Sequence, residues 1–312
     1  MGFRFTRRQL VQLGTQAGAL LAVGAGVRAQ DTPGEAGAKP VRLSLNSSTI
    51  RPLDLEEKVQ VAADAGYDGI ELWINELDDY ANAGKSLEDL GQRIVDLGLQ
   101  VPNIIGLWNC MPAEDDQREA ALREVRRKIE QAQKVKSEHV AVICTPDRDD
   151  LDVLWAGDRY REIMAIGDEY GVIPAVEFVG FNRGIRTLGQ AAAIAVHSNH
   201  PQAGIIADTF HLYRGGSGFR GVRQLSADAI AVCHFNDVPP NPPQFELRDS
   251  DRIYPGDGIL PLVEFVKDLR AIGFHGWLSL EMFNRTYYEM PALENARTGL
   301  SKMRAVLQAG ED

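Results

Sequence analysis

Short apolar runs alternate with longer amphipathic segments from residue 41 to the end of the chain. The runs are rich in β-branched residues, as expected for parallel strands buried on both faces. The segments between them repeat apolar residues at helical spacing, and several end at a glycine. Strands are predicted at 41–45, 69–73, 101–106, 139–144, 172–178, 204–208, 230–234 and 277–282. Helices are predicted at 55–65, 87–97, 117–134, 160–170, 188–197, 262–271 and 291–307.

This alternation predicts a single α/β domain over residues 41–309, a (β/α)8 TIM barrel. A chain of 312 residues with 44% hydrophobic composition has the length that such a barrel commonly fills. A doubly wound open sheet is the alternative, but no glycine-rich phosphate turn follows the first strand. The long segment 236–258 carries five prolines and is predicted to form a lid or a pocket wall.

The first thirty residues have the pattern of an export signal. Thr6-Arg7-Arg8-Gln9-Leu10 precedes a weakly apolar run at 17–26, and Val27-Arg28-Ala29 offers a small-residue cleavage site. We therefore expect a twin-arginine signal peptide over 1–30, a linker over 31–40 and a periplasmic or extracellular protein. An ordinary amphipathic helix is the alternative, and the glycine content disfavours it. No later apolar run reaches the length of a membrane span, so no membrane association is expected after cleavage.

The composition of the chain disfavours some classes of binding partner. The net charge of −11 disfavours nucleic acid and anionic membranes, which require a basic surface. The three cysteines are an odd number without framework spacing, and Cys144 and Cys233 lie in apolar runs, where buried thiols are expected. A neutral or metal-chelating small molecule is the more natural partner.

Four of the predicted strands each end in one ionisable side chain. These residues are Glu177, Asp208, His234 and Glu281, at separations of 31, 26 and 47 residues. The carboxyl ends of parallel barrel strands all face one way, so consecutive strand ends can converge on one point. Any one of these side chains alone could simply bond to loop amides. Together they predict a site.

The chemistry of the set favours a divalent metal ion. Three carboxylates gathered without a cation would have raised pKa values and would cost several kcal/mol. Three oxygens and one nitrogen suit a hard or borderline ion, with Mn²⁺ first and Mg²⁺ or Co²⁺ close behind. Zn²⁺ fits less well, because it prefers fewer ligands and more nitrogen or sulfur.

Such a centre is suited to moving a proton on the carbon beside a ketone. A divalent ion stabilises the enediolate charge that develops on the carbonyl oxygen. Glu177 and Glu281 are predicted to be the acid and base. If one glutamate works alone, the product is an isomer; if both work from opposite faces, it is an epimer. Glu71 could bond to a substrate hydroxyl or to a metal ligand, and Trp108 could stack on a sugar or pack beneath loops.

The residues around several predicted strand ends also form recognisable sequence motifs. Val176-Glu177-Phe178, Asp208-Thr209-Phe210-His211 and His234-Phe235-Asn236-Asp237 are joined by Asp251-Arg252-Ile253-Tyr254-Pro255-Gly256-Asp257-Gly258 and a run that begins at Glu281-Met282-Phe283. Together they resemble the xylose-isomerase-like sugar phosphate isomerase/epimerase superfamily, and most of all its inosose isomerase-like members. The resemblance spans about 41–307.

The resemblance implies that Glu177, Asp208, His234 and Glu281 bind the metal, and that His211 and Arg252 contact substrate. For His211 the alternative is a loop hydrogen bond, and for Arg252 a salt bridge to a neighbouring aspartate. It also implies a small keto-sugar or inosose as substrate and a homodimer as one possible assembly. Most such isomerases work in the cytoplasm, whereas exported relatives act on oxidised glycosides, so a keto-glycoside is a second substrate class.

Three functions stay open at this point. The first is a metal-dependent isomerase or epimerase of a keto-sugar or inosose. The second is a metal-dependent lyase that eliminates a group from a 3-keto-glycoside or related keto-sugar through the same enolate. The third is an exported sugar-binding protein without turnover. Abasic-site endonuclease chemistry would require more metal ligands and a basic face, which the net charge contradicts.

Overall fold

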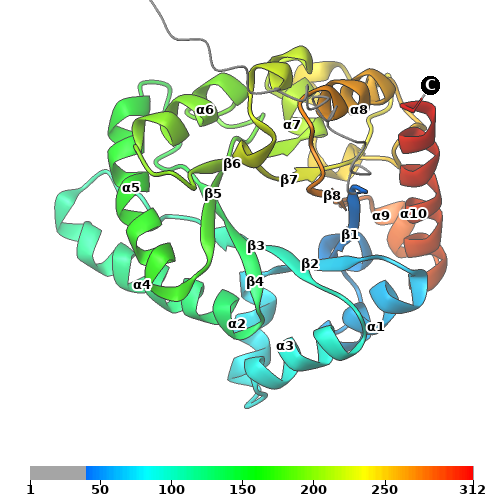
Figure 1. The fold of residues 1–312 in the computed structure, drawn as a ribbon, viewed down its shortest axis with the longest axis horizontal. Helices are drawn as coiled ribbons and strands as arrows, with labels where there is room; N and C mark the ends of the chain where they lie inside the picture. Colours follow the sequence, from blue (N-terminus) through cyan, green and yellow to red (C-terminus); the bar gives the residue numbers. More distant parts are fainter. Residues whose placement is uncertain (1–39, 312) are drawn as a thin grey trace, which may run out of the picture. The chain divides into compact units, whose positions relative to one another are not determined.

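In the computed structural model, which describes residues 40–311, eight parallel strands close into a barrel in sequence order (Figure 1). The predicted signal peptide and nearly all of the linker lie outside these residues. The strands are β1 (Arg42–Asn46), β2 (Gly69–Trp73), β3 (Val101–Leu107), β4 (Ser137–Ile143), β5 (Ile173–Glu177), β6 (Gly204–Asp208), β7 (Ile230–His234) and β8 (Trp277–Leu280). The predicted (β/α)8 fold is confirmed, with each strand boundary within two residues of the prediction.

Helices surround the barrel, as Figure 1 shows. They are α1 (Leu55–Ala65), α2 (Ile74–Asn82), α3 (Leu87–Asp96), α4 (Asp115–Lys134), α5 (Val153–Tyr170), α6 (Leu188–His197), α7 (Thr209–Arg214), α8 (Leu262–Ala271), α9 (Arg285–Tyr288) and α10 (Ala292–Ala309). Local sequence explains many of their ends. Asp54 and Glu57 form a capping box at the start of α1, and Gly66 ends that helix with a φ of 89°.

The sequence pattern did not predict α2, α7 or α9. All three are short, so their residues show little helical periodicity, and the start of α2 also depends on contacts with distant parts of the chain. At the start of α2, the Glu76 carboxylate accepts from the Trp73 amide, the Ser47 hydroxyl and the Lys58 ammonium. Ser47 and Lys58 lie far away in the sequence, so a local pattern could not show this anchor.

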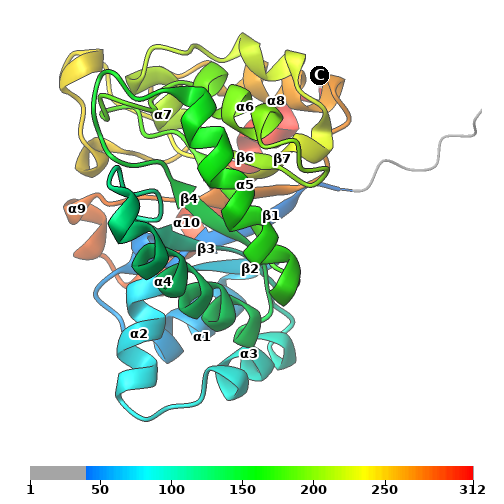
Figure 2. The ribbon, with the colours of Figure 1, turned by 90° about the vertical axis from the view of Figure 1, so that its left-hand side faces the viewer.

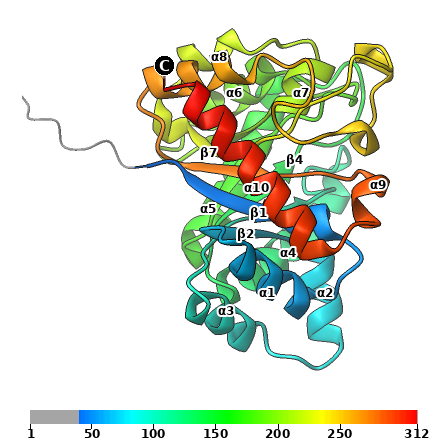
Figure 3. The same cartoon turned by 90° about the vertical axis from the view of Figure 1, so that its right-hand side faces the viewer.

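The apolar core has two parts. The larger part lies between the strands and the surrounding helices, and α10 packs there against α1 and α8 (Figure 3). The smaller part comes from five neighbouring strands, with mostly small side chains: Ile105, Ala141, Ala175, Ile206 and Ala231. Small residues at these positions leave space in the barrel for the polar side chains of its carboxyl end.

The segment 236–258 stands at the carboxyl end of the barrel, at the same end as α9 (Figures 2 and 3). Asp237 closes its base, because this buried carboxylate accepts backbone N–H groups from Val238, Gly256, Gly258 and Leu260 at 2.8 to 3.1 Å. The loop is therefore tied down at both ends by one side chain. It places Arg252 inside the barrel mouth.

Between residues 40 and 311, no helix combines the length and the apolar character that a membrane crossing requires. The three cysteines lie within the same part of the chain, and all are buried and unpaired, as predicted for Cys144 and Cys233. Burial raises the pKa of the Cys110 thiol to about 12, so it is an unreactive neutral side chain.

Candidate metal centre

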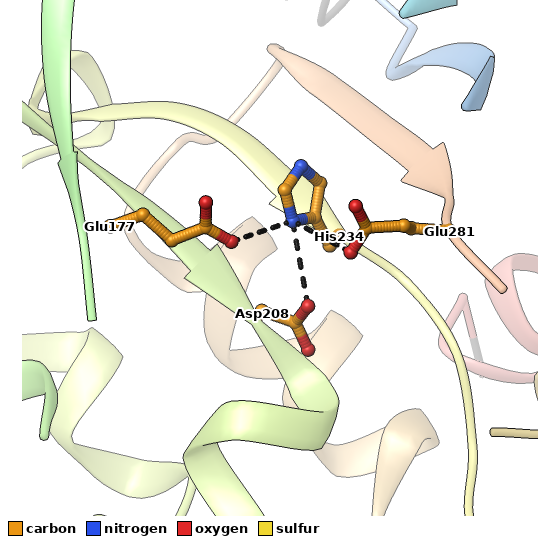
Figure 4. A group of neighbouring side chains, drawn as sticks. All are labelled: Glu177, Asp208, His234 and Glu281. Carbon is orange, nitrogen blue, oxygen red and sulfur yellow. Dashed lines mark ion pairs between the residues drawn. The ribbon is translucent and has the colours of Figure 1, made fainter. Parts of the chain in front are cut away.

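The sheet register brings the four predicted ligands together. Asp208 ends β6 directly beside His234 at the end of β7, and Glu177 ends β5 on the far side of Asp208. Glu281 is the first residue after β8. All four are buried, and one potential ligand atom from each lies within 4.8 Å of the others (Figure 4).

The distances between these atoms fit a shared ion. The Nδ1 atom of His234 lies 3.1 Å from Glu177 Oε1, 3.4 Å from Asp208 Oδ2 and 3.3 Å from Glu281 Oε2. Nδ1 is buried, yet none of these contacts has hydrogen-bond geometry. Two ligands that are each about 2.1 Å from one ion, at tetrahedral or octahedral angles, lie about 3.0 to 3.4 Å apart. The four side chains therefore form a possible divalent metal site.

The electrostatics of the centre are set by several acidic side chains crowded around one imidazole. Burial disfavours charge on His234, but Glu281, Glu71 and Glu177 outweigh it and raise the His234 pKa well above its ordinary value. Burial also raises the pKa of Glu281 well above the usual range. Asp208 is buried too, but Arg252 and His211 outweigh that effect and hold its pKa well below the usual range.

Glu71 lies behind His234. Its Oε1 atom is 3.0 Å from His234 Nε2, on the opposite side of the ring from the three carboxylates. Burial favours the neutral form of Glu71, but His234 and the bonds from Ser279 and Asn103 outweigh it and lower the pKa. The side chain is fully buried and lies against His234, one of the four predicted metal ligands.

Arg252 reaches the centre from the long loop and is 1% exposed. Its Nη1 atom donates to Asp208 Oδ2 at 2.6 Å and to Glu281 Oε2 at 2.9 Å. Its Nε and Nη2 atoms donate to Asp249 at 3.1 and 2.7 Å. The predicted alternative of a salt bridge to Asp249 is therefore present, together with two further ion pairs to predicted metal ligands.

His211 stands beside Arg252, at the start of α7. Its backbone N–H donates to Asp208 Oδ1, so Asp208 caps α7 with one oxygen and faces the centre with the other. The ring Nε2 lies 3.4 Å from Arg252 Nη2, while the buried Nδ1 has no partner among the described residues. Burial lowers the His211 pKa, which favours a neutral ring with a free polar atom.

An aromatic wall flanks the centre on the β2 and β3 side. Trp108 is 36% exposed and stacks on Trp73, with ring centroids 5.6 Å apart. Trp73 meets the edge of Phe283, which lies under the Arg252 guanidinium at 5.2 Å. One face of Trp108 is thus covered by protein, and the residue also lines a cavity of about 790 Å³ over α4.

Several polar residues that were not predicted from the sequence also support the centre. Asn46 ends β1 and donates to Glu71 Oε2 at 2.9 Å and to Glu281 Oε1 at 3.3 Å. Asn103 and Ser279 also donate to Glu71, and Asn236 donates to the Glu281 carbonyl. Asn46 stood at a strand exit, the same signal that revealed the four acidic and imidazole groups. Asn103 and Ser279 lie inside strands, where no sequence signal distinguished them.

The fold and the site together are those of a parallel α/β barrel with a possible divalent metal site at the carboxyl ends of its strands. Sequence comparison agrees, because the xylose isomerase-like TIM barrel family matches residues 59–306. The chain belongs to this family.

Individual relatives differ in activity. The inosose isomerase of Bacillus licheniformis is 36% identical over 138 residues, which are 44% of this chain and 49% of the relative. The 3-dehydroshikimate dehydratase of Pseudomonas putida is 26% identical over 251 residues, 80% of this chain and 39% of the relative. Each match thus spans half or less of the curated relative's length.

Solved structures show the same barrel. The IOLI protein, solved with a bound zinc atom, has a TM-score of 0.79 and 25% identity, covering 86% of this chain and 98% of that protein. L-ribulose 3-epimerase, at 19% identity and a TM-score of 0.70 over 87% of this chain and 96% of its own, shares the fold.

Proposed function

We propose that this protein is a divalent-metal-dependent isomerase or epimerase of a keto-sugar or inosose. The observation that carries the proposal is the placement of Glu177 and Glu281, which approach His234 Nδ1 from opposite sides (Figure 4). One glutamate that removes and returns a proton on the same face would give an isomer, and two glutamates that act from opposite faces would give an epimer. The inosose isomerase relatives support the substrate class.

The proposal assigns a separate role to each residue of the candidate site. Glu177, Asp208, His234 and Glu281 would hold the ion, which would stabilise negative charge developing on a carbonyl oxygen. Glu177 and Glu281 would take and return the proton beside that carbonyl. Arg252 would donate to a substrate oxygen. The partnerless Nδ1 of His211 would bond to a substrate hydroxyl.

The alternative is elimination through the same enolate. The match with a 3-dehydroshikimate dehydratase extends over 80% of this chain, a longer stretch than the inosose isomerase matches. A lyase needs an acid beside the departing group, and one of the two buried glutamates, Glu177 or Glu281, would supply it. A 3-keto-glycoside would be its substrate if the protein is exported.

Incubation in D₂O with Mn²⁺ distinguishes these reactions. Inosose and 3-keto-glucosides are each mixed with the loaded protein and followed by NMR and mass spectrometry. Deuterium beside the ketone with unchanged composition supports isomerisation or epimerisation, whereas loss of water or an aglycone supports the lyase. Glu177→Gln is the site variant, and Glu56→Gln, in a partly exposed ion pair with Lys85 on α1, is its control. No exchange in any mixture, with metal bound, would instead favour a sugar-binding protein.

A further inference from the structure

The Glu71 carboxylate is surrounded by four hydrogen-bond partners from four different strands. Oε1 accepts from Asn103 Nδ2 at 2.6 Å and lies 3.0 Å from His234 Nε2. Oε2 accepts from Asn46 Nδ2 at 2.9 Å and from Ser279 Oγ at 2.6 Å. Each oxygen of a carboxylate can accept about two hydrogen bonds, so the acceptor capacity of Glu71 is filled.

This arrangement determines which nitrogen of His234 faces the centre. With Nε2 protonated and donating to Glu71, the lone pair of Nδ1 is left for a ligand position among the three carboxylates. The other tautomer would place a proton on Nδ1 and leave Nε2 as an acceptor facing the acceptor oxygen of Glu71. The His234 side chain is fully buried, so the ring has no space to rotate out.

We propose that Glu71 is a positioning residue that holds His234 in the tautomer and orientation required for metal binding. This inference rests on the metal site of the proposed function. It assigns Glu71 no contact with substrate, because the side chain is fully buried and both oxygens are occupied.

Asn46 extends the effect of Glu71 to a second ligand. Its Nδ2 group bonds to Glu71 Oε2 and also lies 3.3 Å from Glu281 Oε1, and its Oδ1 accepts from Trp73 Nε1 at 2.8 Å. A glutamine at position 71 would have to point its NH₂ group at two donors, either Asn46 and Ser279 or Asn103 and His234. The substitution therefore disturbs the supports of both His234 and Glu281 while retaining side-chain volume.

Metal titration tests the proposal. Metal-free wild-type protein and Glu71→Gln are titrated with Zn²⁺ against a chelator of known affinity. We expect about 10- to 100-fold weaker binding by the variant, with one ion per chain retained. Glu76→Gln is the matched control, because Glu76 also accepts several bonds in a largely buried setting outside the centre. It should bind Zn²⁺ as the wild type does.

A second measurement uses the wild-type protein and so does not depend on the variant folding. In the Zn²⁺-loaded protein labelled with ¹⁵N-histidine, His234 should show a coordinated Nδ1 and a protonated, slowly exchanging Nε2, a signal that is lost in His234→Ala. Coordination through Nε2, or wild-type affinity in a folded Glu71→Gln variant, would overturn the inference and leave the proposed function standing. Wild-type protein that binds no ion would overturn both.

Discussion

Arg252 and Asp208 are joined inside the barrel mouth by a hydrogen bond of 2.6 Å from Nη1 to Oδ2. The same oxygen of Asp208 faces His234 Nδ1. The other end of the guanidinium is held by Asp249, which belongs to the long loop and whose side chain is 35% exposed. The loop and the metal centre are thus coupled through one arginine.

Asp249→Asn should loosen that coupling. The variant loses the charged partner of Arg252, and charge-assisted bonds contribute about 1.5 to 3 kcal/mol where they are sheltered from water. Because Asp249 is partly exposed, we expect a loss at the lower end of this range, about 1.5 kcal/mol. This corresponds to about a tenfold decrease in kcat/KM for deuterium exchange. Asp228→Asn, at an exposed position away from the centre, is the control. Equal exchange rates in both variants would show that Asp249 does not position Arg252.

Asp208→Asn should separate metal binding from folding. One equivalent of a tightly bound ion, at about 100 times its Kd, stabilises the folded protein by about 2.7 kcal/mol, which thermal unfolding detects. We expect Mn²⁺ to raise the Tm of the wild type and to have little effect on the variant. An equal rise in both proteins would place the ion elsewhere on the chain.

Metal affinity should increase with pH. In the metal-free protein, the neighbouring carboxylates raise the His234 pKa well above its ordinary value, so an incoming ion must displace a proton. Below that pKa, affinity should increase about tenfold per pH unit for each proton released. Calorimetry in buffers of different ionisation enthalpy counts the protons. A count of zero between about pH 6 and 8 would mean that His234 is already neutral there.

Gly258→Ala should destabilise the base of the long loop. A Cβ atom at this position would overlap Val238 O and Asp237 Oδ1, so the four bonds to Asp237 would have to shift. We expect a loss of about 1 to 3 kcal/mol in the free energy of unfolding, measured in urea. Gly189→Ala in α6 meets no atom within 4 Å and should be neutral or stabilising, by up to about 1 kcal/mol. Similar effects in both would argue against close packing at Gly258.

Export remains a prediction from the first thirty residues. Replacing Arg7 and Arg8 together by lysine should leave unprocessed precursor inside the cell, because the twin-arginine route recognises the pair itself. Arg4→Lys keeps the same charge nearby and should not block processing. Mass spectrometry of the cellular fractions measures both. Normal processing of the double variant would show that export does not depend on the arginine pair, and absence of processing in the wild type would remove the reason to consider a keto-glycoside substrate.

Part of the candidate site could be predicted from the polar residues that end apolar runs. Asp208 and His234 were identified because each ends an apolar run, and the parallel register then placed them side by side. The same reasoning could have included Asn46, which ends β1. It could not have shown that Glu71 faces His234, because those residues are 163 positions apart and meet only across the barrel interior.

The sequence by itself determined the barrel, its strand order and the four residues at its carboxyl end, because strand and helix periodicity and strand-end polarity are local properties. Only the tertiary structure decided the supporting contacts. Glu71 turned out to support His234, and Arg252 to bridge Asp208 and Glu281, because barrel closure brings distant side chains into hydrogen-bond range. The short α2 likewise depends on Ser47 and Lys58. Such pairings depend on where strands and loops meet in space, which residue spacing does not encode.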